Sequence, residues 1–353
     1  MPIVAEEYAF VIGVDTHAAT HSLALVNAPA GGVVDQAVFP NSPAGLDRAL
    51  SWIARGIDGQ SALVVIEGVG SYGAGLAERV TGSGLLVAEP AAMPAAQRRG
   101  VGKTDALDAV RIARSVLAID TSRLRWPRAD GPRVALRVLT VARDQMVAER
   151  TRAINALTAL LRTVDLGVDV RKALLHSHFK VIAAWRERKE DPVIATCRQE
   201  AVRLAKRIVD LDGELVDNRK ALTAVVDDVA PELCELPGVG SVVAACVLTA
   251  WSHPGRVRSE AAFAALAGTC PIPASSGNTV RHRLNRGGDR RLNRALTTVA
   301  IVRMRTDAPT RAYVARRRAQ GRTTKEIMRS LKRYITRQLY RTLAAAHPVP
   351  AAP

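Results

Sequence analysis

The 353-residue sequence has few aromatic residues, four cysteines and no long hydrophobic run. Phe, Trp and Tyr make up 4% of the chain, so the aromatic clusters on which RNA-recognition and single-strand-binding folds stack bases are not expected. The cysteines, Cys197, Cys234, Cys246 and Cys270, show neither CxxC spacing nor a pairing pattern, which favours reduced thiols in a cytosolic protein. The longest apolar run, Val242–Trp251, is shorter than the ~20 residues that a membrane span requires. We therefore expect a soluble, cytoplasmic protein without a membrane partner.

Basic residues are concentrated in the last hundred residues of the chain. Residues 251–353 contain 21 Lys and Arg against 4 Asp and Glu, a surplus that equals the net charge of +17, whereas residues 1–250 contain 29 of each kind. Residues 1–120 hold 12 acidic and 8 basic residues, so an acidic part precedes a basic part. A positive field of this size attracts polyanions. We expect nucleic acid rather than an anionic membrane as the partner, because the sequence shows no amphipathic anchor.

Short apolar segments in the first 120 residues predict a mixed sheet. Strands are expected at Phe10–Asp15, His21–Val26, Val33–Phe39, Ser61–Glu67 and Leu85–Ala88. Tight connections between the first three strands favour an antiparallel meander, and helices are expected at 43–55, 73–80 and 104–118. Three strands followed by helix, strand, helix, strand and helix is the element order of the ribonuclease-H-like fold.

From residue 133 to about residue 228 the hydrophobic pattern is helical. Leu139, Met146, Ala153 and Leu160 recur every seven residues, and the apolar residues from Ile194 to Leu215 alternate by three and four. This pattern predicts a coiled-coil seam, either within one chain as an antiparallel hairpin or between two chains. After residue 231 the chain is again mainly helical, with basic helices expected at 289–305 and 323–343.

Four acidic residues lie where the expected strand order brings chain segments together. Asp15 ends the first strand and Glu67 ends the fourth, while Asp105 and Asp108 leave one face of the last helix about one turn apart. Clustered carboxylates repel one another unless a cation lies between them, and Mg²⁺ takes oxygen ligands. Such a set can hold two Mg²⁺ ions about 3.5–4 Å apart, as in phosphodiester cleavage. Taken singly, each acid could instead face solvent at a strand end or favour the positive end of the helix dipole.

The segment 273–291, PASSGNTVRHRLNRGGDRR, combines a serine with a high density of arginine. Ser276 becomes an effective nucleophile only when its proton is removed and its target phosphate is held. The planar forks of arginine suit bidentate phosphate contacts. The arginines that follow the serine are Arg281, Arg283, Arg286, Arg290, Arg291 and Arg294. A hydroxyl-capped turn explains the two serines and the following glycine equally well.

The sequence LPGVG at 236–240 lies between short expected helices and has the form of a helix-hairpin-helix. Backbone amides at Gly238 and Gly240 could face a phosphate at a helix N-terminus without reading base sequence. A Pro-Gly pair also makes ordinary interhelical turns, so both interpretations stay open.

Three further patterns suggest other chemistries. Gly68–Gly73 is a literal GxGxxG between a strand and a helix, typical of dinucleotide binding, but three strands precede it where the fingerprint normally begins its domain. GVGKT at 100–104 lacks the leading glycine of a P-loop, because Gln97 stands there. His17 and His21 are expected on a turn and a strand, so no shared metal-binding face is predicted for them.

Six segments, in order, resemble one family. GVDTHAATHSLALV, VVIEGVGSYGAGL, KTDALDAVRIA, LPGVG, FAALAGTCPIPASSG and GGDRRLNRAL are similar to the DEDD-type insertion-sequence transposases, the insertion-sequence 110 relatives, over about residues 9 to 343. Carried over residue by residue, the acidic tetrad of that family falls on Asp15, Glu67, Asp105 and Asp108. Its nucleophilic serine falls on Ser276, with Ser275 as the lesser alternative. Ala18 stands where many relatives have a lysine, so a basic contact beside the first acid is in doubt.

The resemblance implies a ribonuclease-H-like (RuvC-like) domain at 1–125, a helical coiled-coil linker at 126–230, a C-terminal transposase domain at 231–345 and a disordered tail at 346–353. It also implies a Mg²⁺-dependent DNA transposase and recombinase that acts on donor and target DNA and binds a structured bridge RNA as its guide. Such a protein is expected to assemble as a dimer or tetramer and to associate with the prokaryotic nucleoid. Strand exchange and RNA guidance come from the likeness alone, whereas the residues themselves predict a metal-dependent nucleic-acid enzyme.

Three alternatives have different requirements. A junction-resolving nuclease needs the acidic tetrad but no serine. A non-catalytic DNA- or RNA-binding scaffold needs neither, and a nicotinamide-dependent oxidoreductase needs only the glycine fingerprint. Whether Ser276 acts with the carboxylates of its own chain or of a neighbour is open at this level.

Overall fold

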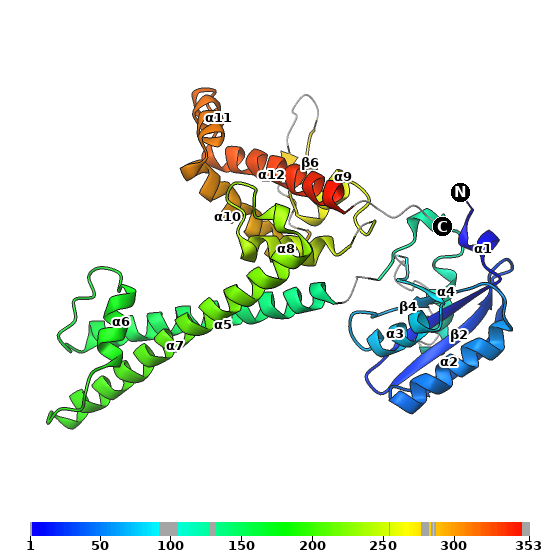
Figure 1. The fold of residues 1–353 in the computed structure, drawn as a ribbon, viewed down its shortest axis with the longest axis horizontal. Helices are drawn as coiled ribbons and strands as arrows, with labels where there is room; N and C mark the ends of the chain where they lie inside the picture. The colour runs from blue at the N-terminus through cyan, green and yellow to red at the C-terminus, as the bar shows by residue number, and fades with distance from the viewer. Residues whose placement is uncertain are drawn as a thin grey trace. The chain divides into compact units, whose positions relative to one another are not determined.

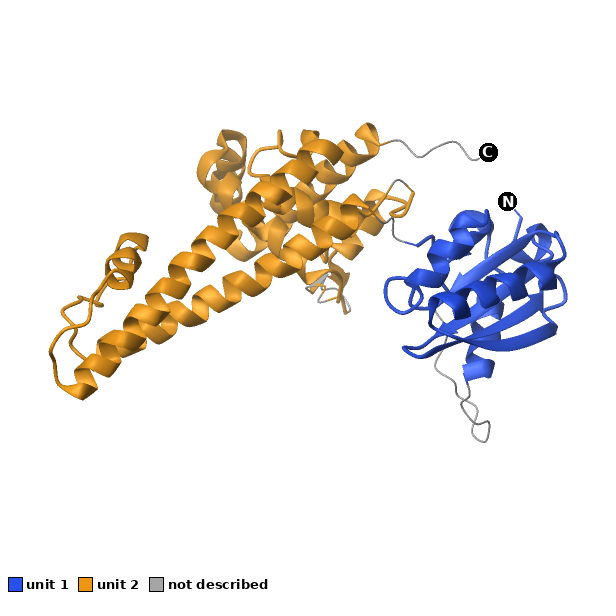
Figure 2. Cartoon of the chain, turned by 60° about the horizontal axis from the view of Figure 1, so that its bottom comes forward, with its two compact units in different colours: residues 1–128 blue, residues 129–353 orange. Residues whose placement is uncertain are grey.

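The computed structural model describes residues 2–91, 105–127, 131–253, 255–276, 282–283, 285 and 287–347. The chain divides into two compact units, residues 1–128 and residues 129–353, which have different colours in Figure 2. The acidic first part of the sequence therefore lies in one unit and the basic last hundred residues lie in the other.

Unit 1 is built around a five-stranded mixed sheet (Figure 1). Its strands are β1 (Phe10–Thr16), β2 (Thr20–Asn27), β3 (Val33–Pro40), β4 (Ala62–Ile66) and β5 (Leu86–Ala88), in the order β3-β2-β1-β4-β5. The first three strands pair antiparallel, as predicted, whereas β1 with β4 and β4 with β5 are parallel pairs. The mixed α/β class is confirmed, and the strand order is consistent with the expected ribonuclease-H-like fold.

Helices cover both faces of the sheet because its central strands are apolar on both sides. On one face, α2 (Pro43–Ile57) and α3 (Ala74–Gly82) pack on Ile12 and Val14. On the other face, α4 (Asp105–Arg114) and the short α1 (Val4–Glu7) pack on Val11, Leu63 and Val65. Helix α4 ends four residues earlier than predicted, and the chain continues through turns into the 3-10 helix η1 (Thr121–Arg123).

Helix α4 lies very close to β1 at Gly13. A Cβ atom at this position would be 2.1 Å from the backbone oxygen of Ala109 and 2.5 Å from the backbone nitrogen of Ala113. Because no side chain fits there, only glycine permits this packing. Ala24 of β2 packs with Ala109 and Val110 in the same layer. Small residues therefore determine how closely α4 approaches the sheet.

Two long helices of unit 2, α5 (Pro132–Thr163) and α7 (Pro192–Val229), lie side by side and run in opposite directions (Figures 1 and 2). One apolar cluster joins Ala153, Leu157 and Leu161 of α5 to Ala201, Leu204 and Ile208 of α7. The short helix α6 (His176–Ala183) adds Phe179 and Ile182 to this cluster. The buried apolar residues of the two long helices thus pack against each other within one chain, whereas Leu139, Met146 and Leu160 of the seven-residue repeat are only partly buried.

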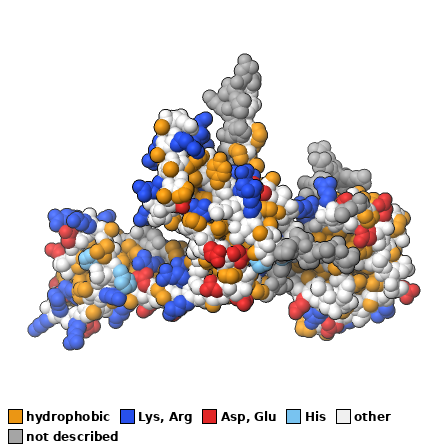
Figure 3. Space-filling model, turned by 45° about the horizontal axis from the view of Figure 1, so that its top comes forward, with side chains coloured by type: hydrophobic (Ala, Val, Ile, Leu, Met, Phe, Trp, Pro, Cys, Tyr) orange, Lys and Arg blue, Asp and Glu red, His pale blue; other side chains and the backbone are white. Residues whose placement is uncertain are grey.

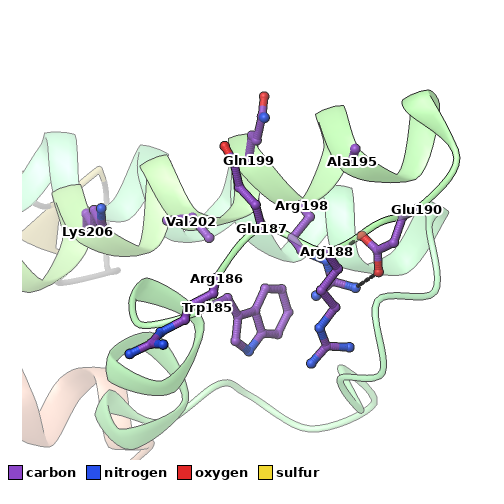
Figure 4. Close-up of a pocket in the computed structure, with 10 residues that line it drawn as sticks. All are labelled: Trp185, Arg186, Glu187, Arg188, Glu190, Ala195, Arg198, Gln199, Val202 and Lys206. Carbon is purple, nitrogen blue, oxygen red and sulfur yellow. Dashed lines mark hydrogen bonds and ion pairs between the residues drawn. The ribbon is translucent and has the colours of Figure 1, made fainter.

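A charged and aromatic cluster fastens the chain between α6 and α7 (Figure 4). The guanidinium carbon of Arg198 lies 4.9 Å from the ring centre of Trp185, and the same guanidinium donates hydrogen bonds of 2.6 and 2.7 Å to the carboxylate of Glu190. These side chains line a cavity of about 370 Å³. Because Arg198 is buried and its charge is matched by Glu190, we assign this cluster to the structure of the hairpin end.

The rest of unit 2 is helical around one apolar core. Its helices are η2 (Pro231–Leu233), α8 (Ser241–Trp251), α9 (Glu260–Leu266), α10 (Arg290–Thr306), α11 (Ala308–Ala319) and α12 (Thr324–Ala346), with the short strand pair β6 (Ile272–Pro273) and β7 (His282–Arg283). Helix α11 was not predicted, although Asp307 caps its N-terminus by accepting hydrogen bonds from Thr310. Helix α12 extends one residue into the predicted tail, and residues 348–353 lie outside the described residues. None of the helices in the described ranges is long and apolar enough to cross a membrane.

Replacing Gly13 by alanine tests the close approach of α4. We expect Gly13→Ala to destabilise unit 1 by about 1–3 kcal/mol, because the helix must move away from the sheet. Gly32→Ala is the matched control, since a Cβ there would have no atom within 4 Å, and its effect should stay within about 0.5 kcal/mol. Denaturant unfolding followed by circular dichroism measures both changes. Equal stability of the two variants would show that the contact does not constrain α4.

Candidate active site

The ends of β1 and β4 place two of the predicted carboxylates side by side. In the parallel register Val14 lies opposite Ile66, so Asp15 and Glu67 follow at the same edge of the sheet. The backbone nitrogen of Glu67 donates to the oxygen of Val14 at 3.0 Å, and the hydroxyl of Thr16 donates to the oxygen of Glu67 at 2.7 Å. These bonds fasten the two strand ends together. The side chain of Asp15 is nearly buried, whereas Glu67 is exposed.

The first turn of α4 supplies the other two carboxylates. Gln36 of β3 donates a 3.0 Å hydrogen bond to the backbone oxygen of Ala106, which holds this turn over the sheet. Asp105 is exposed, and Asp108 accepts a 2.8 Å hydrogen bond from Arg111 one turn later. The preceding Lys103 and Thr104 of the predicted motif lie outside the described residues.

Asp15 and Asp105 lie together with a histidine that the sequence analysis did not assign to the site. His17 Nδ1 lies 3.9 Å from Asp15 Oδ2 and 3.9 Å from Asp105 Oδ2. Ligand atoms of these three residues all lie within 4.8 Å of one another, the only such group of His, Cys, Asp and Glu among the described residues. The sequence feature that points to His17 is its Asp-x-His spacing at a strand end, which differs from the spacing of His pairs on a helix.

The electrostatics of Asp15 link it to the whole predicted tetrad. Burial raises the pKa of Asp15, the nearby His17 lowers it, and the negative charges of Glu67, Asp105 and Asp108 raise it further. The net pKa is above the usual value for aspartate. The other three predicted acids therefore each lie close enough to influence Asp15, although Glu67 and Asp108 are not members of the tight group.

The donor set of this group fits a divalent cation. Separations of 3.9 Å are too long for hydrogen bonds between His17 and the carboxylates. Two ligands that each lie about 2.1 Å from one ion are at most about 4.2 Å apart, so these separations leave room for an ion. Carboxylate oxygens suit Mg²⁺, and an imidazole nitrogen is also a common ligand of Mn²⁺ or Zn²⁺.

The predicted serine lies in unit 2, at the end of the segment that carries β6. Ser276 is exposed, and three residues before it Pro273 ends β6, which pairs antiparallel with β7. In this pair Ile272 lies opposite Arg283, one of the predicted phosphate-binding arginines. Arg281 and Arg286 lie outside the described residues.

Several of the other residues predicted to contact nucleic acid form ion pairs or close packing contacts within the chain. Arg291 and Arg294 both pair with Asp144 of α5, at 2.9 and 3.6 Å, whereas Arg290 is exposed. Gly238 has a positive φ of 76°, and a Cβ there would lie 3.3 Å from the backbone oxygen of Val299 in α10. Gly240 precedes α8 as its N-cap and is exposed. The positive φ and these close contacts both favour glycine at 238, and its role toward phosphate stays a prediction, as does that of Gly240.

The glycine fingerprint at 68–73 also has a packing explanation. A Cβ at Gly73 would lie 2.8 Å from Ile66 and 3.1 Å from Thr16, and Gly68 has a positive φ of 72°. The glycines thus allow the chain to turn closely around the end of β1 beside Asp15. No dinucleotide is needed to explain them.

Comparisons with known proteins agree with one family. Residues 12–165 match the family described as a DEDD transposase of the IS110 type, and residues 230–315 match the family described as the IS116/IS110/IS902 transposases. An uncharacterized 42 kDa protein of insertion element IS900 from Mycobacterium paratuberculosis is 32% identical over 302 residues, which cover 71% of this chain and 74% of that protein. An uncharacterized 43.6 kDa protein of insertion element IS110 from Streptomyces coelicolor is 27% identical over 66% of this chain and 69% of that protein.

Replacing Asp15 by asparagine tests the electrostatics of the site. Because the pKa of Asp15 is raised in the folded state, its contribution to stability is present at low pH and is lost as the pH rises through that pKa. In EDTA at neutral pH, Asp15→Asn should therefore melt at a temperature equal to or higher than the unchanged protein. Mg²⁺ at about 100 times its Kd should stabilise the unchanged protein by about 2.7 kcal/mol and leave the variant unaffected.

The exposed Asp58 provides the control for this experiment. Asp58→Asn keeps a residue type that tolerates the left-handed conformation of this position, where φ is 44°. It should change neither the melting temperature in EDTA nor the response to Mg²⁺. A metal response that persists in Asp15→Asn would exclude Asp15 as a ligand.

Proposed function

This chain belongs to the IS110 family of insertion-element transposases, and from that premise we propose that it cleaves and exchanges DNA strands with a magnesium-dependent acidic site and a serine nucleophile. The observation that carries this proposal is the group formed by Asp15, His17 and Asp105, with Glu67 and Asp108 close enough to raise the pKa of Asp15. Family membership makes the protein an enzyme that cleaves and joins DNA. The metal, the serine and the RNA guide are the proposed refinements.

The acidic residues hold the metal in this proposal. Asp15 and Asp105 would supply carboxylate oxygens to the ion, and Glu67 and Asp108 would complete the set once the cation offsets the repulsion between the four charges. A Mg²⁺ held there would neutralise negative charge at the phosphate and stabilise the charge that develops on the leaving oxygen. The exposed position of Glu67 and Asp105 leaves the site open to a strand of DNA.

Ser276 forms the covalent link to DNA. Its Oγ bonds to the phosphorus as the bond from phosphorus to one bridging oxygen breaks, and the proton of the hydroxyl passes to that leaving oxygen. A free deoxyribose hydroxyl of a second strand then attacks the same phosphorus, displaces Ser276 and returns its proton. The number of phosphodiester bonds is conserved, so exchange requires no external energy source.

The RNA guide and the oligomer extend the same proposal. The basic surplus of residues 251–353 suits polyanion binding, and Gly240, Arg283 and Arg290 are exposed. We propose that this region contacts donor and target DNA together with a structured guide RNA, within a dimer or tetramer. The four acids lie in unit 1 and Ser276 lies in unit 2.

Alanine at Ser276 tests the covalent step. We expect Ser276→Ala to lower the denaturant-resistant adduct between protein and end-labelled DNA to background while DNA binding is retained. Ser275→Ala is the matched control and should keep the adduct. Electrophoresis in detergent measures the adduct directly. Undiminished cleavage and joining by Ser276→Ala would instead favour a junction-resolving nuclease that uses the acids alone, and loss of the adduct only in Ser275→Ala would move the nucleophile by one residue.

A further inference from the structure

A basic pocket in unit 2 lies outside the residues that the sequence predicted for nucleic-acid binding, apart from Arg283. The pocket has a volume of about 740 Å³ and is formed by the segment 268–271, Arg283 of β7, the end of α11 and one face of α12. Seven lysine and arginine residues line it, against a single acid, Glu326. Figure 3 shows Lys and Arg side chains gathered on α11 and around it.

Several of these cations lack an acidic partner. Among the described residues, no Asp or Glu oxygen lies within ion-pair distance of Arg283, Arg317 or Arg329. Arg333 and Arg337 also line the pocket, and both share the single carboxylate of Glu260, at 2.8 and 3.0 Å. The pocket therefore carries a large uncompensated positive charge, which an anion would relieve.

Lys332 is the clearest sign of an anionic ligand. Its ammonium donates a 2.6 Å hydrogen bond to the neutral side-chain oxygen of Asn293, and Asn293 in turn donates a 2.6 Å bond to the backbone oxygen of Ala267. Lys332 is half-buried, and this burial lowers the pKa of its ammonium group. A partly buried cation held in place by a neutral partner is unfavourable in the free protein and is stabilised when a phosphate enters.

Aromatic and planar groups in the pocket suit a nucleic-acid strand rather than a small anion. The side chain of Tyr334 is largely exposed at the pocket and meets Tyr313 edge to face, with ring centres 6.0 Å apart. An exposed aromatic ring between arginines is the combination on which bases or sugars stack while the phosphates are bound.

The pocket is continuous with the segment that carries the serine. Cys270 and Pro271 line it, β6 follows immediately, and Ser276 is five residues beyond Pro271. Five residues span at most about 17–18 Å when fully extended. With a rise of about 3.4 Å per nucleotide along one strand, a strand attacked by Ser276 would reach the pocket within about five nucleotides of the cleaved phosphate.

We propose that this pocket binds the phosphodiester backbone of the DNA strand that Ser276 attacks and holds that strand next to the serine. The arginines and Lys332 contact successive phosphates, and Tyr334 packs on a base or sugar between them. This inference rests on the proposed role of Ser276 for its choice of DNA as the ligand. The existence of an anion-binding pocket does not depend on that role.

The test compares two triple variants of the full chain that each also carry Ser276→Ala, in EDTA, so that binding is measured without cleavage. Arg283→Gln, Arg317→Gln and Arg329→Gln together remove three charges from the pocket. Arg137→Gln, Arg152→Gln and Arg162→Gln together remove three exposed charges from α5, which lie outside residues 251–353 and do not line the pocket. Thermal melts of both variants verify that the fold is retained. The probes are a labelled duplex, its single strand and a hairpin RNA, each titrated at several KCl concentrations.

The pocket variant should bind DNA at least 10-fold more weakly, and the slope of log K against log salt should fall by about 2 to 3, the value for three lost phosphate contacts. The control variant should change affinity less than 3-fold. Equal losses in the two variants would mean that only the general positive field binds DNA. Loss of RNA binding with DNA binding unchanged would assign the pocket to RNA and overturn the proposal. A failed Ser276→Ala adduct test would leave these binding results intact, so the two proposals fail separately.

Discussion

Helix α4 can lie against β1 only because residue 13 has no side chain. The absence of a Cβ at Gly13 lets the backbone of α4 at Ala109 and Ala113 approach the strand directly. This approach brings the first turn of α4, with Asp105, to the end of β1, where Asp15 and His17 lie. The hydrogen bonds that join β1 to β4 through Thr16 and Glu67 bring the carboxylate of Glu67 to the same edge of the sheet. One backbone contact and one hydrogen-bonded strand pair thus assemble the acidic site.

The assembled site is electrostatically unfavourable without a cation. Asp15 is nearly buried and lies near three other acids, and both features raise its pKa. Arg111 compensates Asp108 in part, and His17 faces both Asp15 and Asp105 without hydrogen bonding to either. Packing holds α4 in place despite the repulsion between the carboxylates, and a divalent cation would remove most of that repulsion. Unit 2 shows the opposite excess, with cations around Lys332 and Arg329 that an anion would stabilise. Both imbalances fit the proposed activity of a metal-dependent enzyme on DNA.

Much of unit 1 could be predicted because its signals are local. Alternation and apolar runs located the five strands within one or two residues, and the order of the elements predicted that Asp15, Glu67, Asp105 and Asp108 lie at one edge of the sheet. His17 was missed because its role depends on a turn that points it toward α4. Helix α11 was missed although Asp307 is a helix cap, because the basic segment around it carries little hydrophobic period.

The contacts that distant segments of unit 2 make with one another could not be predicted from the sequence. Arg291 and Arg294 were predicted to bind phosphate, yet both pair with Asp144, which lies about 150 residues earlier in the chain. Gly238 was likewise predicted to contact phosphate. In the structure it packs against Val299 of α10, and this close contact favours a small residue. In the sequence, Lys332 and Arg329 are isolated charges without a recognisable motif. They line one pocket only because α12 folds beside the segment 268–271.

The most direct measurement of the central claim is a crystal structure of the protein grown with Mn²⁺, with anomalous diffraction to locate the ion. We predict an anomalous peak between Asp15 and Asp105, about 2.1–2.2 Å from a carboxylate oxygen of each residue. Manganese bound elsewhere with no peak between these two carboxylates, or a structure in which they lie too far apart to share one ion, would contradict it.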